Sequence, residues 1–375
     1  MTGRSASTPL RNISYLTPFF APAVGGAARY VEILGRELLR ERACDSFRVV
    51  TERHPSTASR ERSRDGVDVL RVFPHRAGAT RKGVASYAAY GVQNLGFLGL
   101  ARWLGDADVA FVHGSFLNNP SLLPAGVRRL RRRRRAPKLV LDLRDPKFPA
   151  GASKHFASFD AVIASSENIR RRLDGFDEVW VIPIMIEPLL VPPEAAAGTA
   201  ARFGLRPQGY VFNGSGFHRG KGTEELVDVV TEIRRLGHDV DLAIAGKRRH
   251  WTPRFDRALR EGWLRPLGEL PTLDVRQLAV GSWIDVNLST VDSLPRHSLE
   301  ALQSGARVFL PAGVPEFDGI AHSVAQPGEA VASMAERIIH AALDPPFGSD
   351  VYDVSAHAPG RVIQGYLRMI EALVA

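Results

Sequence analysis

Cysteine is almost absent from this chain, since Cys44 is the single one among 375 residues. No disulfide framework can therefore form within the chain. Proteins without structural disulfides are typical of a reducing compartment. Residues 1–11 also lack the apolar stretch of a secretory signal. Together these absences predict a cytoplasmic location.

A long apolar run is missing as well. The longest weakly charged stretch, residues 86–104, contains Gln93, Asn94 and Arg102 and is too polar for a convincing membrane span. Its apolar residues show patchy helical spacing. We therefore expect a helix or a pair of helices packed on the protein.

Motifs for metal binding and for a serine nucleophile are also absent. The sequence contains no H-E-x-x-H, no paired cysteines and no cluster of histidines. It has no G-x-S-x-G elbow that would present a serine nucleophile. We expect no bound metal ion, so the chemistry is expected to rest on other side chains.

Length and composition indicate two globular domains. The chain is too long for one ordinary hydrophobic core, and 45% of its residues are apolar. Its net charge of +9 is uneven, because residues 1–187 hold 30 of the 49 Lys and Arg but only 18 of the 40 Asp and Glu. The first half therefore carries +12 and the second half −3. A basic first half favours an anionic partner.

The densest positive charge is the arginine run of residues 128–135, with seven arginines among eight residues. Such a run can contact anionic lipid headgroups, nucleic acid or an anionic substrate. A solvated helix face is the alternative, although neighbouring arginines repel each other without counterions. No aromatic residue interrupts the run for base stacking, so nucleic acid is the least favoured partner.

Strands and helices alternate along both halves of the chain. The first half shows strand patterns at residues 12–16, 47–51, 67–73, 108–113, 138–143, 161–164 and 179–182, with a helix at 29–42. A proline- and alanine-rich linker is predicted at 188–209. The second half shows strand patterns at 210–212, 241–245, 284–288 and 308–310, with helices at 223–236, 273–279 and 361–375. This alternation predicts an α/β protein with two doubly wound layers and a ligand between them.

Two carboxylates are the most informative feature of the second half. Asp292 and Glu300 lie eight residues apart across a predicted strand-to-helix turn, and Glu300 opens an apolar helical pattern. Open α/β sheets bind ligands at such turns, where an acidic residue accepts hydrogen bonds from ribose hydroxyls. The pair therefore indicates a polyol ligand, which we interpret as a nucleotide sugar.

The glycine-rich segment 213–222 follows a strand pattern and precedes a helix. Glycines let phosphates approach the backbone, and Arg219 and Lys221 add positive charge. It is not a Walker A loop, because Ser215 replaces the first glycine and Gly222 the final Ser or Thr. It also departs from G-x-G-x-x-G, since Arg219 occupies the third glycine position. A phosphate site is favoured over a simple connecting loop.

Two further strand ends carry candidate residues in the first half. Gly25 and Gly26 precede a predicted helix and could admit a ligand, although many tight turns contain two glycines. His113 ends a strand, where it could contact a substrate or move a proton, and a structural role is the alternative. Asp142 and Arg144 end the next strand, where pairing with each other is the simplest explanation.

These motifs together resemble those of the retaining glycosyltransferases of family four. Asp292 and Glu300, with seven residues between them, resemble the family's E-x7-E motif. Residues 301–305 resemble the helix that follows this motif. The Gly-Lys-Gly loop around Lys221 resembles the family's donor loop, and Gly25-Gly26 its N-terminal glycine loop. Residues 108–114 resemble its D-V-V-H-x-H-G strand end. The resemblance covers most of the chain in the same order.

The resemblance implies the GT-B fold, in which two Rossmann-like domains face each other across a cleft. Residues 1–187 would form the acceptor domain, and residues 188–360 the nucleotide-sugar donor domain. The last helix, 361–375, would cross back to the first domain. The nucleotide sugar would be a substrate, and neither a cofactor nor a metal ion would be needed.

The resemblance also implies roles for single residues. Glu300 would hold the donor ribose, Asp292 the hydroxyls of the donor sugar, and Lys221 would neutralise the diphosphate leaving group. His113 would contact the donor sugar or the acceptor side, and Gly26, next to Gly25, would allow the close approach of acceptor or diphosphate. The remaining donor-binding residues would be Gly216, Arg219, Arg296, Ser298 and Leu299.

Three positions differ from the family's pattern. The first carboxylate is Asp292 instead of a glutamate, which shortens its reach by about one methylene. Gly216 stands where the family usually has an arginine, and we hypothesise that Arg219 or Arg296 supplies the missing charge. The asparagine and glycine of the family's V-I-P-N-G segment are Ile184 and Met185 here. The sequence is thus that of a divergent relative.

The sequence as a whole predicts a retaining glycosyltransferase that uses a nucleotide-diphosphate sugar. The acceptor would be a hydroxyl of a glycan, a lipid-linked or a small molecule, anionic or membrane-associated. The protein would be cytoplasmic, with peripheral contact to the inner membrane face through the arginine run Arg128–Arg135. An inverting transferase, a sugar phosphorylase and a non-catalytic nucleotide-sugar-binding protein remain alternatives.

Overall fold

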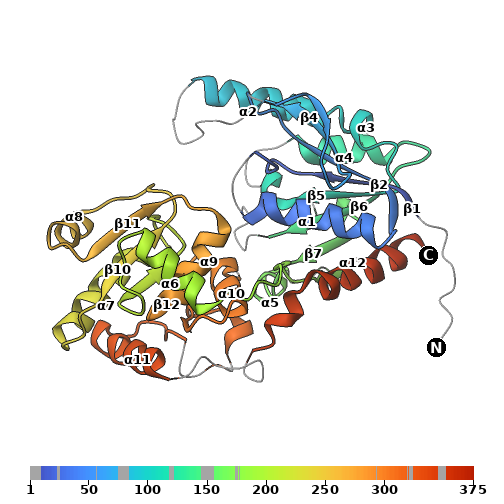
Figure 1. Cartoon of the computed structure of the whole chain (residues 1–375). Helices are drawn as coiled ribbons and strands as arrows, with labels where there is room; N and C mark the ends of the chain where they lie inside the picture. Colours follow the sequence, from blue (N-terminus) through green and yellow to red (C-terminus); the bar gives the residue numbers. More distant parts are fainter. Residues whose placement is uncertain are drawn as a thin grey trace, which may run out of the picture. The chain divides into compact units, whose positions relative to one another are not determined.

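A computed structural model of the chain divides it into two compact units (Figure 1). The first contains Met1–Met185 and Pro359–Ala375, and the second Ile186–Ala358. The residues that the structure describes are 10–22, 26–55, 57–74, 84–117, 122–144, 156–173, 176, 178–292, 294–318, 320, 324–344 and 352–375.

The described residues of the first unit form one eight-stranded sheet with the order β3-β4-β2-β1-β5-β6-β7-β8. The strands are β1 Leu10–Leu16, β2 Cys44–Glu52, β3 Arg60–Arg62, β4 Asp68–Phe73, β5 Val109–His113, β6 Lys138–Leu143, β7 Ala161–Ala164 and β8 Val179–Val181. All neighbours pair in parallel except β3, which runs antiparallel to β4 at the edge. Every residue of β5 is buried, as expected for a parallel strand covered on both faces.

Helices cover both faces of this sheet. They are α1 Gly26–Arg40, α2 Val84–Phe97, α3 Leu100–Trp103, α4 Leu123–Arg131, α5 Glu167–Arg170 and α12 Pro359–Val374, with a short 3₁₀ helix at Gly114–Leu117. On one face, Leu34 of α1 and Met369 of α12 share a core with Phe47 of β2. On the other face, Leu100 of α3 and Val127 of α4 belong to a second core. The last helix therefore packs on the first unit, as the fold prediction required.

A buried polar network holds α12 in this position. Asp142 of β6 accepts a hydrogen bond of 2.5 Å from the Tyr15 hydroxyl and pairs with Arg144 at 2.7 Å. Arg144 donates to the Tyr30 hydroxyl on α1 at 2.6 Å and to the Tyr366 hydroxyl on α12 at 2.5 Å. The pairing of Asp142 with Arg144 expected from the sequence is present. The guanidinium group of Arg144 thereby joins two helices, α1 and α12, to strand β6.

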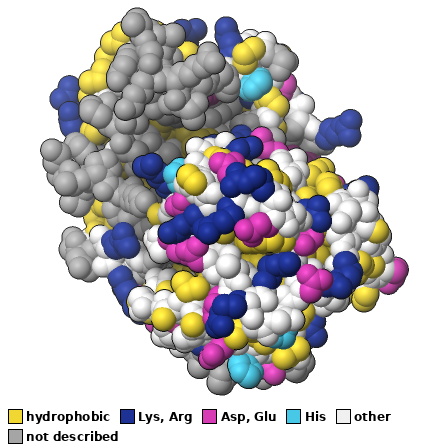
Figure 2. Space-filling view, turned by 90° about the vertical axis from the view of Figure 1, so that its left-hand side faces the viewer, with side chains coloured by type: hydrophobic (Ala, Val, Ile, Leu, Met, Phe, Trp, Pro, Cys, Tyr) yellow, Lys and Arg dark blue, Asp and Glu magenta, His cyan; other side chains and the backbone are white. Residues whose placement is uncertain are grey.

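The described residues of the second unit form a five-stranded parallel sheet with the order β11-β10-β9-β12-β13. The strands are β9 Tyr210–Asn213, β10 Asp241–Ala245, β11 Leu264–Gly268, β12 Ile284–Val286 and β13 Val308–Phe309. The helices are α6 Pro193–Arg202, α7 Thr223–Arg235, α8 Pro253–Arg260, α9 Thr272–Gly281, α10 Arg296–Gln303 and α11 Val331–Leu343, with 3₁₀ helices at Pro315–Phe317 and Val354–His357. The face in Figure 2 mixes Lys and Arg with Asp and Glu.

The predicted α/β class with two doubly wound layers is confirmed, but the predicted linker at 188–209 is partly wrong. Residues Pro193–Arg202 form α6, because proline suits the first turn of a helix and the following alanines favour helix. The stretch 86–104 contains most of α2 and all of α3, so the expected helix pair is present. Within the described ranges, no helix is both long and apolar enough to cross a membrane.

Candidate active site

Each sheet has one topological switch point, where neighbouring strands connect to helices on opposite sides. In the first unit it lies between β1 and β5, and in the second between β9 and β12. Ligands of open α/β sheets bind beyond the carboxyl ends of the strands at such points. The segments predicted to bind ligand, around Gly26, His113, Lys221 and Asp292, all follow these four strands or open the next helix.

Two asparagines at the strand ends shape the loops of the second unit. Asn213, the last residue of β9, donates to the Val286 carbonyl at 2.7 Å and accepts from the Ser215 N–H at 2.9 Å. Asn287, just after β12, accepts from the Ser289 N–H at 2.9 Å and donates to the Ser298 hydroxyl at 3.0 Å. Both asparagines are buried, so each loop leaves its strand in a fixed direction.

Close contact between the two loops requires glycine. The Thr290 N–H donates to the Gly220 carbonyl at 3.0 Å, which joins the loops through their backbones. Gly222 has a φ of +68°, and a Cβ there would overlap the Leu288 carbonyl oxygen. Only glycine adopts this conformation without strain and leaves that space. The Gly-Lys-Gly pattern is therefore explained by loop packing as well as by ligand access.

This packing brings the predicted lysine and the first carboxylate together. Lys221 Nζ forms an ion pair with Asp292 Oδ1, and the side chains are 25% and 22% exposed. Arg296 Nε donates to Glu300 Oε1 at 2.8 Å on α10, where the Glu300 side chain is 12% exposed. Glu300 lies in the second turn of α10 and not at its start, because the helix begins at Arg296. Two carboxylates and two cations thus line one switch point.

On α10, next to Arg296, lies His297, which forms with Asp285 a buried histidine–aspartate pair that the sequence interpretation missed. His297 Nε2 lies 2.7 Å from Asp285 Oδ2 of β12 and 3.1 Å from the backbone nitrogen of Gly214. Burial lowers the pKa of His297, but Asp285, Glu300 and Asp292 together raise it above the ordinary histidine value. An aspartate in the middle of an apolar strand, which needs a buried partner, was the available signal.

His297 also explains a glycine at the start of the donor loop. A Cβ at Gly214 would lie 2.5 Å from the imidazole ring. The ring packs edge to face on Phe212 of β9, with centroids 5.7 Å apart. His297 therefore contacts the start of the loop at Gly214 and strand β12 at Asp285.

The other predicted donor-site residues differ in burial and in hydrogen bonding, which the sequence did not show. Ser298 is buried and its hydroxyl accepts from Asn287. Leu299 is fully buried, and its N–H donates to the Pro295 carbonyl within the helix. Arg219 is exposed beside the N-terminus of α7 and has no side-chain partner within the described ranges. Their roles toward a ligand stay predictions.

Gly216, the position of the family's arginine, is a forced glycine. Its φ is +70°, and a Cβ there would lie 2.9 Å from the backbone nitrogen of Lys247. An arginine would therefore suffer both an unfavourable conformation and a collision with the backbone. Arg296 already pairs with Glu300, which leaves Arg219 as the more available replacement for the hypothesised charge.

In the first unit, His113 ends β5 and is 6% exposed. Its Nδ1 accepts from the Ser115 N–H at 3.2 Å and lies 2.9 Å from the Ser115 hydroxyl. Because a backbone N–H can only donate, the proton of the neutral ring belongs on Nε2. Burial, opposed by Asp142 and aided by Arg144, lowers the pKa of His113 to about 4. The ring is therefore neutral at pH 7.

The His113 Nε2 is buried without a hydrogen-bond partner in the described structure. A buried donor without an acceptor is costly, so an unfilled donor at a switch point favours a ligand contact. Gly26 is exposed at the first position of α1, after the loop that follows β1. Gly25 lies outside the described residues.

The arginine run begins on α4 and continues past its end at Arg131. Arg131 pairs with Asp160 at 2.9 Å, and Arg133 donates to the Ala101 carbonyl at 2.9 Å. Arg132, Arg134 and Arg135 are exposed. Within the described ranges, no group of three or more His, Cys, Asp and Glu is arranged to hold a metal ion.

Comparisons with known proteins give the fold. No protein-family model and no curated protein sequence matches the chain. A glycosyltransferase from Rickettsia africae is similar in structure, with a TM-score of 0.74, 12% identity and coverage of 97% of this chain and 98% of that one. Anabaena HepE with UDP and glucose reaches 0.70 at 17% identity, covering 97% and 99%. Sucrose-phosphate synthase from Thermosynechococcus elongatus reaches 0.69 at 16%, covering 97% and 94%.

These likenesses cover both units and show that the chain has the GT-B fold, as predicted. At 12–17% identity they do not extend to substrate or activity. The function therefore has to be argued from the residues at the two switch points.

Proposed function

We propose that this protein is a retaining glycosyltransferase that moves a sugar from a nucleotide-diphosphate sugar to a hydroxyl acceptor. The observation that carries the proposal is the meeting of Lys221 and Asp292 at the switch point of the second sheet. Glu300, on the helix α10 that follows Asp292, adds a second carboxylate, one oxygen of which accepts a hydrogen bond from Arg296. Lys221 can bind the diphosphate of such a donor, Glu300 its ribose and Asp292 its sugar.

The chemistry follows from these charges. Lys221 neutralises the diphosphate as it departs and gains charge, which lowers the barrier. Glu300 accepts hydrogen bonds from the ribose hydroxyls. Donor binding draws Lys221 toward phosphate, which frees Asp292 to accept from the sugar hydroxyls. In the absence of donor, the ion pair keeps both half-buried charges compensated.

His113 acts as a neutral hydrogen-bond donor. Its Nε2–H is directed at a substrate oxygen, because Ser115 holds the other ring nitrogen as an acceptor. A pKa near 4 keeps the ring uncharged across the physiological range. Such a donor orients substrate and stabilises developing negative charge without transferring a proton.

The solved neighbours support a uridine nucleotide as the first donor to test. Anabaena HepE has been solved with UDP-glucose, with UDP and with UDP and glucose. A neighbour from Burkholderia xenovorans is described as a UDP-forming trehalose-phosphate synthase. Retention and metal independence remain part of the proposal and rest on the resemblance to family four. The protein is proposed to be located in the cytoplasm.

The test combines a donor screen with site variants. Thermal-shift measurements with UDP, GDP, TDP and ADP sugars identify the donor, and transfer or hydrolysis of that donor is then measured. Lys221→Ala and Glu300→Ala should each lower kcat/KM by about 100-fold or more. Lys138→Ala, which removes an exposed lysine at the start of β6, is the matched control and should keep wild-type activity.

Two outcomes would overturn the proposal. Donor turnover by Lys221→Ala at the wild-type rate would remove the lysine from the chemistry. Binding of a nucleotide sugar without transfer to any acceptor would leave a binding protein. The anomeric configuration of the product separates retention from inversion, and release of a sugar phosphate would identify a phosphorylase.

The acceptor is proposed to be anionic or membrane-associated. The exposed arginines after α4 would then make peripheral contact with an anionic bilayer. Sedimentation with vesicles of phosphatidylcholine alone and of phosphatidylcholine with phosphatidylserine tests this contact. Equal binding to both vesicles, or none, would exclude it.

A further inference from the structure

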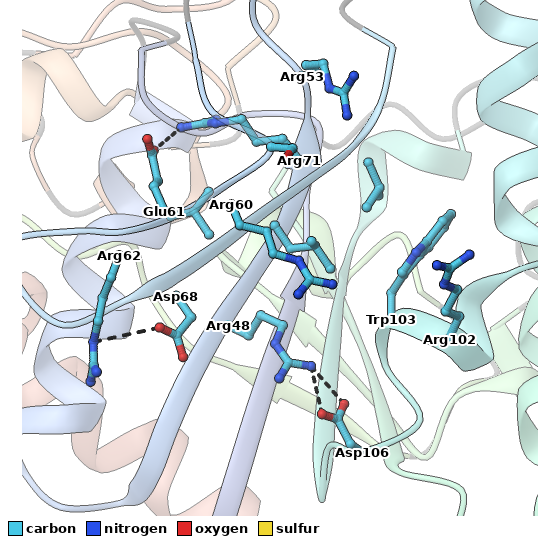
Figure 3. Close-up of a pocket in the computed structure, with 14 residues that line it drawn as sticks. Arg48, Arg53, Arg60, Glu61, Arg62, Asp68, Arg71, Arg102, Trp103 and Asp106 are labelled. Atoms are coloured by element: carbon cyan, nitrogen blue, oxygen red, sulfur yellow. Dashed lines mark hydrogen bonds and ion pairs between the residues drawn. The ribbon is translucent and has the colours of Figure 1, made fainter.

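A cavity of about 820 Å³ lies over strands β2, β3 and β4 and against α3 in the first unit (Figure 3). Six arginines line it: Arg48, Arg53, Arg60, Arg62, Arg71 and Arg102. None of the residues that the sequence assigns to the donor or acceptor site lies among its lining residues. The cavity sits toward the β3 edge of the sheet, and β1 separates its strands from β5.

Half of these arginines are compensated by acidic residues of the same cavity. Arg48 contacts both carboxylate oxygens of Asp106 at 2.9 Å. Arg71 pairs with Glu61, and Arg62 lies 3.7 Å from Asp68. These three carboxylates are the acidic residues of the lining, so three positive charges remain in excess.

The excess charge belongs to Arg53, Arg60 and Arg102. Their guanidinium groups have no partner among the residues that the structure describes, and all three residues are exposed. Arg53 follows β2, Arg60 belongs to β3 and Arg102 to α3, so three separate parts of the chain bring them to one cavity. Figure 3 shows Arg60 and Arg48 extending toward the side where α3 carries Trp103 and Arg102. Unpaired guanidinium groups that line one cavity favour an anion.

A buried guanidinium at the same cavity is incompletely bonded. Arg71 of β4 is only 3% exposed, and although one of its terminal nitrogens pairs with Glu61, its Nε has no hydrogen-bond partner. Buried donors in folded proteins are generally satisfied. A buried and incompletely bonded guanidinium thus lies among the lining residues of the same cavity as the three exposed arginines.

Trp103 adds a flat apolar surface to the charged wall. One side of the indole packs edge to face on Phe73, with centroids 5.2 Å apart, and the residue is half-buried at the cavity. A nucleobase or a sugar ring can lie on such a surface while arginines hold its phosphate. The cavity volume falls in the range of sites for small molecules.

Protection of the sheet edge does not account for this arrangement. Charged side chains on an edge strand prevent pairing with other chains, and this purpose suits Arg60 and Arg62 on β3. Arg53 follows β2, and Arg102 belongs to α3, so neither lies on the edge strand. Their presence at the same cavity needs another cause.

We propose that this cavity binds a small organic phosphate. Arg53, Arg60 and Arg102 hold its phosphate groups, and Trp103 contacts its ring. The ligand is a sugar phosphate or a nucleotide, which share the phosphate and the ring. The site is independent of the donor-binding residues, so it can be tested whatever the protein transfers.

Calorimetric titration of the full chain tests the site with three probes, namely pyrophosphate, glucose 6-phosphate and AMP. Glucose, which lacks a phosphate, is the negative control. The variants are Arg60→Gln and Arg102→Gln, which remove exposed charges without emptying a core. Arg134→Gln, an exposed arginine beyond α4, is the matched control for charge alone. Thermal melting of each variant checks that it is folded.

At least one organic phosphate should bind more tightly than pyrophosphate, because pyrophosphate lacks a ring. Each pocket variant should weaken that binding by about tenfold, and Arg134→Gln should leave it unchanged. Preference for AMP would identify a nucleotide, and preference for glucose 6-phosphate a sugar phosphate. Lys221→Ala should bind the ligand as the wild type does, which separates this cavity from the donor site.

Three results would overturn the proposal. The first is the absence of binding by any of the three probes at millimolar concentration. The second is equal weakening by Arg134→Gln and Arg60→Gln, which would mean general attraction by a basic surface. The third is loss of binding in Lys221→Ala with retention in Arg60→Gln, which would assign the phosphate to the second unit.

Discussion

Replacement of Gly222 by alanine tests whether the two loops of the second unit depend on close backbone contact. The residue has a φ of +68°, and an L-residue in this region costs about 1–2 kcal/mol. The added Cβ would also overlap the Leu288 carbonyl oxygen, and relief of such overpacking costs about 1–3 kcal/mol. Gly222→Ala should therefore destabilise the fold by about 2–5 kcal/mol.

The second unit provides a matched control for this substitution. Gly237 also has a positive φ, +96°, but a Cβ there would meet nothing within 4 Å. Gly237→Ala should cost only the conformational part, about 1–2 kcal/mol. The difference between the two variants isolates the contact between the loops.

Urea unfolding and titration with the donor identified in the screen provide the two measurements. Gly222→Ala should be less stable than Gly237→Ala and should bind donor more weakly, because Lys221 and Asp292 are carried by the displaced loops. Gly237→Ala should bind donor as the wild type does. If both variants lost equal stability and kept wild-type donor affinity, the argument that these loops are held together by their glycines would be refuted.

Three further predictions concern the buried polar groups. His113 has a folded pKa of about 4, below its unfolded value, so stability should be lost as the pH falls from about 6.5 toward 4, and urea titrations of His113→Gln should show less of this loss. His297 has a raised pKa, so its contribution is fully present below about pH 6.5 and is lost as the pH rises through the folded value; stability of His297→Gln should lack this alkaline decline. Tyr366→Phe removes an acceptor of Arg144 and should lower the free energy of unfolding by about 1–3 kcal/mol in urea titrations, whereas an unchanged value would mean that apolar packing alone holds α12.

Much of the fold could be predicted because buried parallel strands are continuous apolar runs between turn residues. Lys138–Leu143, Ala161–Ala164 and Asp241–Ala245 have the predicted bounds for this reason. The helix Pro193–Arg202 was missed, since its prolines resemble those of a linker until the following alanines are weighed. Strand β11, Leu264–Gly268, was also missed, because its exposed arginine and proline weaken the pattern of an edge strand.

The candidate site was predicted in part for a related reason. Lys221 and Asp292 stand at the ends of recognisable strands, and parallel topology brings such ends to one edge of the sheet. The contact between Asp285 and His297 was not predicted. The local patterns assign Asp285 to a strand and His297 to the turn between Asp292 and Glu300, and neither pattern shows that the two side chains meet. The unfilled Nε2 of His113 is also invisible in sequence, since it depends on the tautomer that Ser115 selects.

The facing glycines at 216 and 246 limit how this chain can change. Gly246 has a φ of +124°, and a Cβ there would lie 2.8 Å from the Cα of Gly216, just as a Cβ at Gly216 would meet Lys247. Each position is therefore restricted to glycine by its own positive φ and by backbone atoms of the facing segment, and a substitution at either one is penalised. No substitution of a neighbouring side chain removes backbone atoms, so selection or design for a stronger phosphate site would have to place the new charge elsewhere than at 216. Exposed Arg219, on the same loop, is the available starting point.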